Sequence, residues 1–297
     1  SSRPFLATQI QGIKVTFPNR LSGLIYQSGA TLERTAWQKG MIDYLRQQNV
    51  TVHFESAVSD PSQIDADWLI GADGPVSKVR KSINGKVTMK PAVQYRMKLS
   101  GPRRHKSDFL EFFFDEMFYA GKMGYGYGWV FPRGDLFNVG VAGTFEMLDA
   151  FLEKYEIYGE IVEKAGAPIA INGTCFEQGR VFLLGDAAGL TNPLSCGGLA
   201  AIICCADYLR QALEGGRPGI YTALIKTHHY HPSIWRHKHD LFYLPDRMLE
   251  KAGAVCRNSR IDPKSPAFMA RLAVRPCLWP SLLRMAPHIR AFKRVSW

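Results

Sequence analysis

The stretch Gly179–Leu213 constrains the fold of this chain more than any other part of the sequence. It opens with the apolar run Val181-Phe182-Leu183-Leu184, whose length and composition are typical of a strand buried on both faces of a parallel sheet. Gly185-Asp186 follows this run, and the pair Gly197-Gly198 precedes apolar residues that recur at helical spacing from Leu199 onward. The stretch therefore predicts a strand, a turn that carries an aspartate, a glycine-rich turn and a helix.

These elements together suit the binding of a polar ligand. Glycines at a helix N-terminus allow another group to approach free backbone N–H groups, where the helix dipole favours partial negative charge. An aspartate at the carboxyl end of a parallel strand can accept a hydrogen bond from a sugar or polyol hydroxyl. The pattern favours a site for an extended, partly anionic cofactor, and the alternative is an ordinary tight strand-to-helix turn.

The same stretch resembles a known cofactor motif. Gly185-Asp186-Ala187-Ala188-Gly189, followed by Pro193 and by Gly197-Gly198-Leu199, is similar to the second flavin motif of the glutathione-reductase-type FAD enzymes. The resemblance implies that Asp186 holds the ribityl chain of FAD. It also implies that the N-terminus of the following helix faces the N1/O2 side of the isoalloxazine ring.

A second motif lies about 110 residues earlier in the chain. Trp68-Leu69-Ile70 has the composition of a short buried strand, and Gly71-Ala72-Asp73-Gly74 predicts a tight turn after it. The segment resembles the Asp-Gly motif of flavin hydroxylases and related reductases, in which this turn supports the pyrophosphate region of the cofactor. The resemblance assigns Asp73 and Gly74 to the cofactor site, although such a turn is common when it stands alone.

The segment before this motif predicts a helix and a strand. Thr31 is a suitable cap for a helix that runs to about Gln48, and Trp37, Met41 and Leu45 recur every four residues, so we expect one face to be buried. A strand is expected from Val50 to Glu55. In the flavin enzymes an arginine early in this helix contacts the flavin region, and Arg34 is the matching residue. The alternative is a solvated arginine at a helix end.

Between the two flavin-type motifs, residues 87–145 change to aromatic strands separated by glycine and charged turns, which predicts an inserted antiparallel sheet. A charged amphipathic helix is expected from Met147 to Ala165. Within the insert, Tyr127-Gly128-Trp129-Val130-Phe131-Pro132 matches a Tyr-x-Trp-x-Phe-Pro pattern of the geranylgeranyl reductase family. Alternate residues share one strand face, so Tyr127, Trp129 and Phe131 predict an aromatic wall for a hydrocarbon substrate. The family pattern adds Pro132 to the expected substrate site. The alternative is a half-buried strand without a ligand.

The resemblance to geranylgeranyl reductases implies an α/β fold. We expect a Rossmann-like parallel sheet layer that binds FAD or NAD(P) and is incomplete at its N-terminus, an inserted antiparallel substrate sheet and a helical C-terminal region. The expected boundaries are 1–86 and 176–218 for the FAD-binding parts, 87–175 for the insert and 219–297 for the C-terminal region. The sequence has no Gly-x-Gly-x-x-Gly fingerprint, and Cys196-Gly197-Gly198 stands where relatives often have Gly-Glu-Gly. We therefore expect the chain to be a fragment or processed product that binds FAD weakly or not at all.

Charge is concentrated at the C-terminal end of the chain. The net charge is +11, and residues 219–297 hold fourteen Lys and Arg against four Asp and Glu. With tryptophans among its arginines, the last stretch suits a membrane interface as well as it suits a helical cap on the core. Nucleic acid is disfavoured because no binding module accompanies the charge. The histidines of this region, with Pro232 between them, disfavour a metal site.

The composition predicts a globular protein in the cytoplasm, with membrane association through the basic region. Six cysteines without a Cys-x-x-Cys spacing predict reduced thiols, and no apolar run approaches the roughly 20 residues that cross a bilayer.

The function implied by the resemblance is reduction of isoprenoid C=C bonds by FAD, with NADPH or a ferredoxin-type carrier as electron donor. A monooxygenase or halogenase on the same fold is the alternative among enzymes. Gly189 stands where hydroxylases commonly have histidine, and Tyr127 and Phe131 differ from the halogenase pattern. The other alternative is a truncated, non-catalytic flavoprotein that binds membrane surfaces.

Overall fold

The computed structural model of the chain describes residues 5–101, 108–119, 126–192, 196–216, 219–229 and 244–284. The chain divides into two compact units. The first comprises Ser1–Ala57, Ala92–Gly166 and Phe242–Trp279, and the second comprises Val58–Pro91, Ala167–Leu241 and Pro280–Trp297. The α/β fold class predicted from the sequence is confirmed, whereas the predicted domain boundaries stay a prediction.

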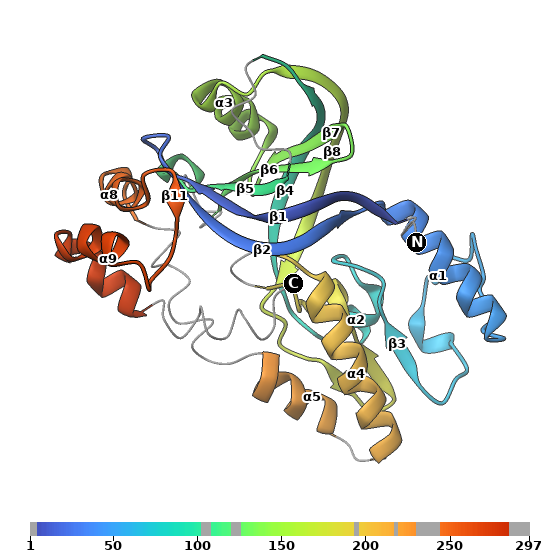
Figure 1. The fold of residues 1–297 in the computed structure, drawn as a ribbon. Coiled ribbons are helices and arrows are strands. Elements are labelled where there is room, and N and C mark those ends of the chain that lie inside the picture. Colours follow the sequence, from blue (N-terminus) through green and yellow to red (C-terminus); the bar gives the residue numbers. More distant parts are fainter. Residues whose placement is uncertain are drawn as a thin grey trace. The chain divides into compact units, whose positions relative to one another are not determined.

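The larger sheet of the protein has eight strands in the order β11-β2-β1-β5-β6-β7-β4-β8 (Figure 1). Neighbouring strands from β5 to β4 are antiparallel, as predicted for the insert, while β1 runs parallel to β5 and β11 parallel to β2. A hairpin of two long strands thus extends the insert sheet. The sequence predicts strands with turns in residues 1–29, but not that they join the sheet of the insert. The strands are β1 (Leu6–Thr16), β2 (Ser22–Leu32), β4 (Thr88–Leu99), β5 (Phe109–Phe113), β6 (Gly128–Arg133), β7 (Leu136–Val141), β8 (Gly159–Ile171) and β11 (Ser259–Arg260).

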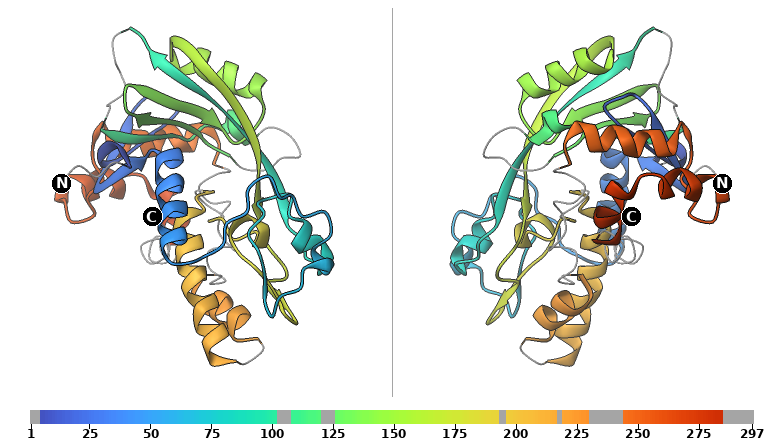
Figure 2. Two further views of the ribbon diagram at one scale, coloured as in Figure 1. Left: turned by 90° about the vertical axis from the view of Figure 1, so that its right-hand side faces the viewer. Right: turned by 90° about the vertical axis from the view of Figure 1, so that its left-hand side faces the viewer.

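One helix, α3 (Phe145–Tyr155), covers one face of this sheet (Figure 2). Its Leu148 and Phe151 are fully buried and belong to the same core cluster as Tyr95 and Val139 of the strands. The prediction of a helix to Ala165 is wrong beyond Tyr155. Glu156 adopts a left-handed conformation with φ 54° that ends the helix, and the following residues extend as β8 because they pair with β4.

The predictions for residues 31–55 need correction. Helix α1 spans Arg34–Gln47 and is preceded by Glu33, not capped by Thr31, because Thr31 pairs with Thr8 in the sheet. The predicted burial of one helix face is wrong, since no residue of α1 is buried and Met41 remains 46% exposed. Residues 50–55 form no strand, because no described strand lies beside them to share backbone hydrogen bonds.

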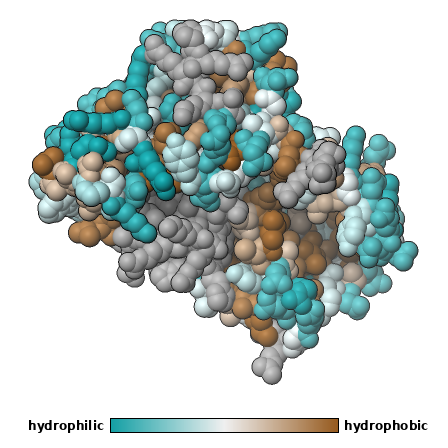
Figure 3. Space-filling view, in the orientation of Figure 1, coloured by the Kyte–Doolittle hydropathy of each residue, from teal (hydrophilic) through white to brown (hydrophobic). Residues whose placement is uncertain are grey.

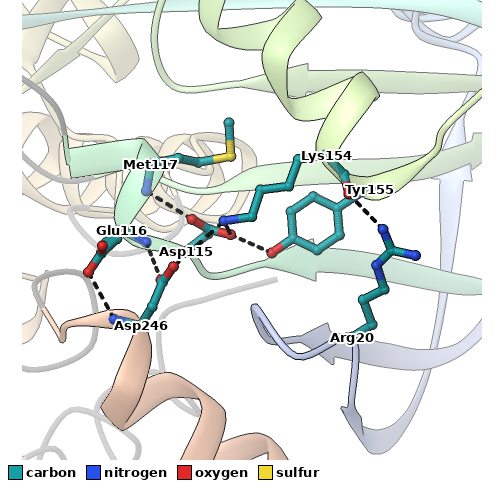
Figure 4. A network of polar contacts seen from close by, with 7 residues as sticks. All are labelled: Arg20, Asp115, Glu116, Met117, Lys154, Tyr155 and Asp246. Atoms are coloured by element: carbon teal, nitrogen blue, oxygen red, sulfur yellow. Dashed lines mark hydrogen bonds and ion pairs between the residues drawn. The ribbon is translucent and has the colours of Figure 1, made fainter.

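A buried polar network fixes helix α8 (Asp246–Cys256) to the sheet of the first unit (Figure 4). Asp115 is fully buried and accepts a hydrogen bond of 2.7 Å from the Tyr155 hydroxyl. It also forms an ion pair of 2.6 Å with Lys154 Nζ. The backbone N–H of Glu116 donates to Asp246, and the backbone N–H of Asp246 donates back to Glu116. The network joins a strand end, α3 and α8, which are distant in sequence. Helix α9 (Pro266–Ala273) and 3₁₀ turns at Glu116–Tyr119 and Pro276–Leu278 complete the described elements of this unit.

The second unit holds a three-stranded sheet in the order β3-β10-β9. Strand β10 (Val181–Leu183) is parallel to β3 (Leu69–Gly71), as the two strand-turn motifs predict, and antiparallel to β9 (Glu177–Gln178). Leu183 is fully buried, but the expected burial of the earlier strand is wrong: Trp68 is 49% and Ile70 43% exposed, because no described element covers that face. The helices are α2 (Lys78–Ser82), α4 (Leu199–Gly215) and α5 (Ile220–Leu224), with a π-turn at Ile225–His229 and a 3₁₀ turn at Pro61–Gln63.

No helix in the described part of the chain combines the length and the apolar composition needed to cross a membrane.

Candidate functional site

The turn after β10 has a backbone that only its glycines adopt easily. Gly185 and Gly189 have φ angles of 61° and 66°, and the residues between them form a single 3₁₀ turn, Gly185–Ala188. The N–H of Gly189 donates to the Asp186 carbonyl, and the N–H of Leu190 donates to the Gly185 carbonyl. The five-residue motif is therefore a closed turn that fixes the position of Asp186.

The Asp186 side chain is directed at the start of α4. A Cβ atom built on Gly198 would lie 3.4 Å from Asp186 Oδ1, and Gly198 is the N-cap of this helix. Because Gly198 has no side chain, the N-cap residue itself supplies no acceptor to the first backbone N–H groups of α4. Gly197 and Leu199 are exposed, and in Figure 3 hydrophobic surface lies over the first turns of α4 while hydrophilic surface covers its later turns. The structure thus brings Asp186, Gly197, Gly198 and Leu199 together as predicted; Pro193 lies outside the described residues.

The second predicted turn has a structural role that is clear from its contacts. Asp73 Oδ2 accepts hydrogen bonds from the backbone N–H groups of Lys78 at 2.7 Å and Val79 at 3.3 Å, so its carboxylate caps α2. Burial opposes ionisation of Asp73, but hydrogen bonds from Ser77 and from this backbone outweigh it and lower the pKa of the carboxyl group. Gly74 has φ 78°, as the tight turn requires.

Arg80 connects the two turns, and the sequence did not single it out as a site residue. Its Nη1 donates to the Ala187 carbonyl at 2.9 Å and the Asp186 carbonyl at 3.5 Å, while its Nη2 donates to the Pro75 carbonyl at 2.6 Å. The side chain is almost fully buried, and burial lowers its pKa, which the charge of Asp73 partly offsets. A single guanidinium thus bonds the backbone of both flavin-type turns. An arginine buried in a short charged helix has no distinguishing pattern in sequence, so only its position after the Asp73 turn could have indicated it.

Cys196 lies between the described part of the turn and Gly197. Its thiol pKa is raised to about 11, first by burial and then by the charge of Asp186, with Lys90 acting in the opposite direction. The thiol is therefore protonated at neutral pH.

The residues present fit one end of an FAD molecule. The half-buried carboxylate of Asp186 can accept hydrogen bonds from polyol hydroxyls, and the glycines before α4 leave its N-terminus open to a partly negative atom. Nothing in the sequence corresponds to the glycine fingerprint that binds pyrophosphate, so the fit extends to the ribityl and ring end alone.

In the first unit, the predicted aromatic residues share one face of β6. The Tyr127 and Trp129 ring centroids lie 5.8 Å apart, and those of Trp129 and Phe131 lie 6.3 Å apart. Phe112 of β5 adds to this face, with its centroid 5.3 Å from that of Tyr127 and 5.0 Å from that of Phe131. Phe114 lies 6.3 Å from Tyr127. We name Phe112, Phe114, Tyr127, Trp129 and Phe131 the aromatic face. Phe112 belongs to β5 and Phe114 follows its end, in the region where the sequence predicted aromatic strands without assigning these two residues to the site.

The opposite face of β6 is part of the core. Cβ atoms built on Gly128 would lie 2.8 Å from the Phe118 ring and 2.9 Å from the Phe151 ring, so the α3 side leaves no room for a side chain there. On the aromatic face, the Trp129 indole packs on Gly140 of the neighbouring strand, and a Cβ atom built on Gly140 would lie 2.3 Å from Trp129 Cζ2. Trp129 and Phe131 are only half-buried, and Pro132 is buried. The aromatic face is therefore the side of the sheet on which an apolar ligand can be received.

Two other predictions stay as predictions. Arg34 is exposed at the start of α1, in the first unit, and nothing tests its contact with a cofactor. Among the residues that the structure describes, no three His, Cys, Asp or Glu side chains gather as metal ligands, and His231, His237 and His239 lie outside those residues.

The fold defines the class of protein. The chain superposes on a geranylgeranyl bacteriochlorophyll reductase-like protein from Thermoplasma acidophilum with a TM-score of 0.70, at 21% identity, over 95% of this chain and 85% of that one. The flavin-dependent halogenase CmlS gives a TM-score of 0.56 at 16% identity over 95% of this chain and 66% of that one. The chain therefore shares the fold of these two proteins, one of which is a flavin-dependent enzyme.

Sequence comparison narrows the class. Digeranylgeranylglycerophospholipid reductase 3 of Methanosphaera stadtmanae is 27% identical over 66% of this chain and 58% of that protein. The corresponding reductase of Thermoplasma volcanium is 24% identical over 84% of this chain and 75% of that protein. Chloroplastic geranylgeranyl diphosphate reductase of Nicotiana tabacum is 31% identical over 52% of this chain and 36% of that protein. The predicted resemblance to the geranylgeranyl reductases is confirmed.

The chain spans less than two thirds of the length of the first relatives that it matches. The chain covers 58% and 59% of the length of the first two relatives in the sequence comparison, from Methanosphaera stadtmanae and Methanopyrus kandleri. No protein-family model matches the chain.

Proposed function

We propose that the protein is an FAD-dependent oxidoreductase that reduces carbon–carbon double bonds of an isoprenoid or similar hydrophobic substrate. The observation that carries this proposal is the bonding of Arg80 to the carbonyls of Pro75, Asp186 and Ala187. Two turns that each resemble a flavin motif thereby form one cluster, next to the uncapped start of α4. The relatedness to geranylgeranyl reductases supports the isoprenoid as the substrate class.

In this proposal the residues of the second unit bind and orient the cofactor. Asp186 accepts hydrogen bonds from the ribityl hydroxyls, and Gly197, Gly198 and Leu199 present the backbone N–H groups of α4 to the ring. FAD, when bound, supplies the hydride and receives its electrons from NADPH or a ferredoxin-type carrier. Asp73 and Gly74 keep α2 and Arg80 in place below the Asp186 turn.

The aromatic face of the first unit binds the substrate in this proposal. Rings at 5.0 to 6.3 Å from one another form one apolar cluster, and its half-buried members Trp129 and Phe131 offer a surface that favours hydrocarbon. Phe112 and Phe114 widen it across two strands, so that a branched chain has contact on more than one side.

Cofactor binding is tested by substituting Asp186. Asp186→Ala is expected to reduce retention of FAD, measured as flavin absorbance per chain after incubation with FAD and gel filtration. Asp207→Ala, which removes an exposed carboxylate of the same helix α4, is the matched control and should leave retention unchanged. FAD that is retained by the parent and in equal amount by both variants would refute the role of Asp186.

The alternative enzymes are separated by their products. A monooxygenase or halogenase on this fold would yield hydroxylated, epoxidised or halogenated product, whereas the proposed enzyme yields a product with two more hydrogens. A non-catalytic flavoprotein would bind anionic vesicles without flavin absorbance and without product. Mass spectrometry of an incubation with geranylgeraniol, FAD and NADPH distinguishes these outcomes.

A further inference from the structure

The aromatic face ends in polar residues along the sheet. Asn138 of β7 is the cross-strand partner of Phe131 on one side and of Arg96 of β4 on the other, and partners in a ladder point to the same face. Two positions further along β6, Arg133 occupies this face as well. A molecule lying on Tyr127, Trp129 and Phe131 would thus meet Asn138 and, one strand further, Arg96.

Two buried atoms in this row have no hydrogen-bond partner among the described residues. They are Arg96 Nε, a donor, and Asn138 Oδ1, an acceptor. An unpaired buried polar group costs about 1–3 kcal/mol, so a sheet rarely retains two of them side by side without a partner. Cβ atoms of paired positions lie roughly 5 Å apart. The two atoms therefore belong to side chains that lie side by side on one face of the sheet.

The charges around these atoms are already paired within the protein. Arg96 Nη1 forms an ion pair of 2.8 Å with Glu163, and Arg133 forms two hydrogen bonds of 3.2 Å with Glu33. The bonds from Arg133 lower the pKa of Glu33, against a smaller effect of burial, and the charges of Arg133 and Arg96 add to this. The Glu33 carboxyl group therefore ionises more readily than an ordinary glutamate. A phosphate placed here would meet two negative side chains and would leave Asn138 Oδ1 without a donor.

We propose that Arg96 and Asn138 form a subsite for a hydroxyl group at the polar end of the hydrophobic substrate. A hydroxyl accepts one hydrogen bond from Arg96 Nε and donates one to Asn138 Oδ1, which satisfies both atoms with a single oxygen. The ligand class is a long-chain alcohol of the isoprenoid type, in preference to the corresponding diphosphate. This inference rests on the proposed function, because it takes the aromatic face to be the substrate site.

Binding of short isoprenoids to the purified chain tests the subsite without need of flavin. Titration calorimetry compares geraniol, geranyl diphosphate and the matching hydrocarbon without oxygen. Geraniol is expected to bind about tenfold more tightly than either of the other two. Trp129→Leu should weaken the binding of all three ligands, because it removes the apolar contact that they share.

Two variants remove the two hydrogen bonds separately. Asn138→Leu keeps the volume and removes the acceptor, and Arg96→Lys keeps the charge beside Glu163 and removes the Nε donor. Each variant should weaken the binding of geraniol by about fivefold and leave the affinity for the hydrocarbon unchanged. Circular dichroism shows whether each variant is folded. If Asn138→Leu does not fold, the geraniol affinity of Arg96→Lys alone tests the hydroxyl subsite.

The results separate this inference from the proposed function. Tighter binding of geranyl diphosphate than geraniol would overturn the hydroxyl subsite and leave the proposed function intact. Unchanged geraniol affinity in both variants would also overturn it, since water would then fill the subsite. Failure of every isoprenoid to bind would contradict the proposed substrate itself. Geraniol binding that depends on Asn138 in a chain without flavin activity would support the subsite while the proposed reaction fails.

Discussion

The Arg80 guanidinium donates a hydrogen bond of 2.9 Å to the carbonyl of Ala187, although the two residues are 107 positions apart in the sequence. Its other nitrogen donates to Pro75, which follows the turn of Asp73 and Gly74. A planar guanidinium with several fixed donors suits this position, because a lysine ammonium lacks the planar fork. The relative position of two turns in the second unit therefore depends on one side chain.

Replacing Arg80 should disturb both turns at once. Arg80→Met keeps the apolar stem but leaves the carbonyls of Pro75 and Ala187 without their donor, at an expected cost on the order of 3 kcal/mol. Thermal unfolding followed by circular dichroism measures the loss of stability, and flavin absorbance measures the loss of FAD retention. Lys81→Met is the control, because Lys81 is exposed and adjacent in the same helix. A melting temperature equal to that of the control would show that Arg80 does not hold the turns.

Gly189 is expected to tolerate no side chain. Its φ of 66° is unfavourable for other residues, and a Cβ would lie 2.7 Å from Val87 Cγ1 and 2.8 Å from the backbone nitrogen of Gly173. Gly134 has a similar φ of 63° with nothing within 4 Å of its Cβ, so it separates backbone strain from collision. Gly134→Ala should cost about 1 kcal/mol and Gly189→Ala about 2–4 kcal/mol by thermal unfolding. If both variants lose the same free energy of unfolding, Val87 and Gly173 must move to accommodate the new methyl group at Gly189, which contradicts the prediction.

The sequence predicted those features that local patterns encode. The parallel pairing of β3 with β10 follows from two short apolar runs that each end in a glycine turn, and the shared face of Tyr127, Trp129 and Phe131 follows from strand alternation. Arg80 was missed because its partners are backbone carbonyls, which leave no trace in the sequence. The prediction that one face of α1 is buried was wrong. A periodic apolar face shows only that a helix can be buried, and no described element covers this one.

The packing of Trp129 on Gly140 should control the shape of the aromatic face. A Cβ on Gly140 would lie 2.3 Å from Trp129 Cζ2 and 2.5 Å from the Val93 carbonyl oxygen, so the indole would have to move. Gly140→Ala is therefore expected to shift the fluorescence of the protein and to weaken geraniol binding by several fold. Subtracting the spectrum of Trp129→Phe isolates the signal of this indole. The prediction fails if Gly140→Ala changes neither the isolated signal nor the affinity.

The network at Asp115 predicts loss of stability in alkali. Burial opposes the charge of Lys154, but its hydrogen bond and ion pair with Asp115, together with Asp246, raise its pKa above the ordinary 10.5. Such a lysine contributes stability that is complete below pH 10.5 and is lost as the pH rises through the folded-state value. Burial and the hydrogen bond to Asp115 raise the pKa of Tyr155 above the ordinary 10.0, so the unfolded chain ionises first and is favoured at higher pH. Both groups lower the free energy of unfolding above about pH 10.

Urea unfolding between pH 8 and pH 11 measures this loss. The double variant Lys154→Met with Tyr155→Phe should be less stable at pH 8, because Asp115 loses two partners, and its stability should then change less between pH 10 and pH 11. Tyr158→Phe removes a tyrosine that is 60% exposed and should retain the alkaline loss of the parent. An equally steep decline in the double variant would place the alkaline sensitivity outside the Asp115 network. A shallower decline would identify the attachment of α3 and α8 to this strand end as the element that yields first in alkali.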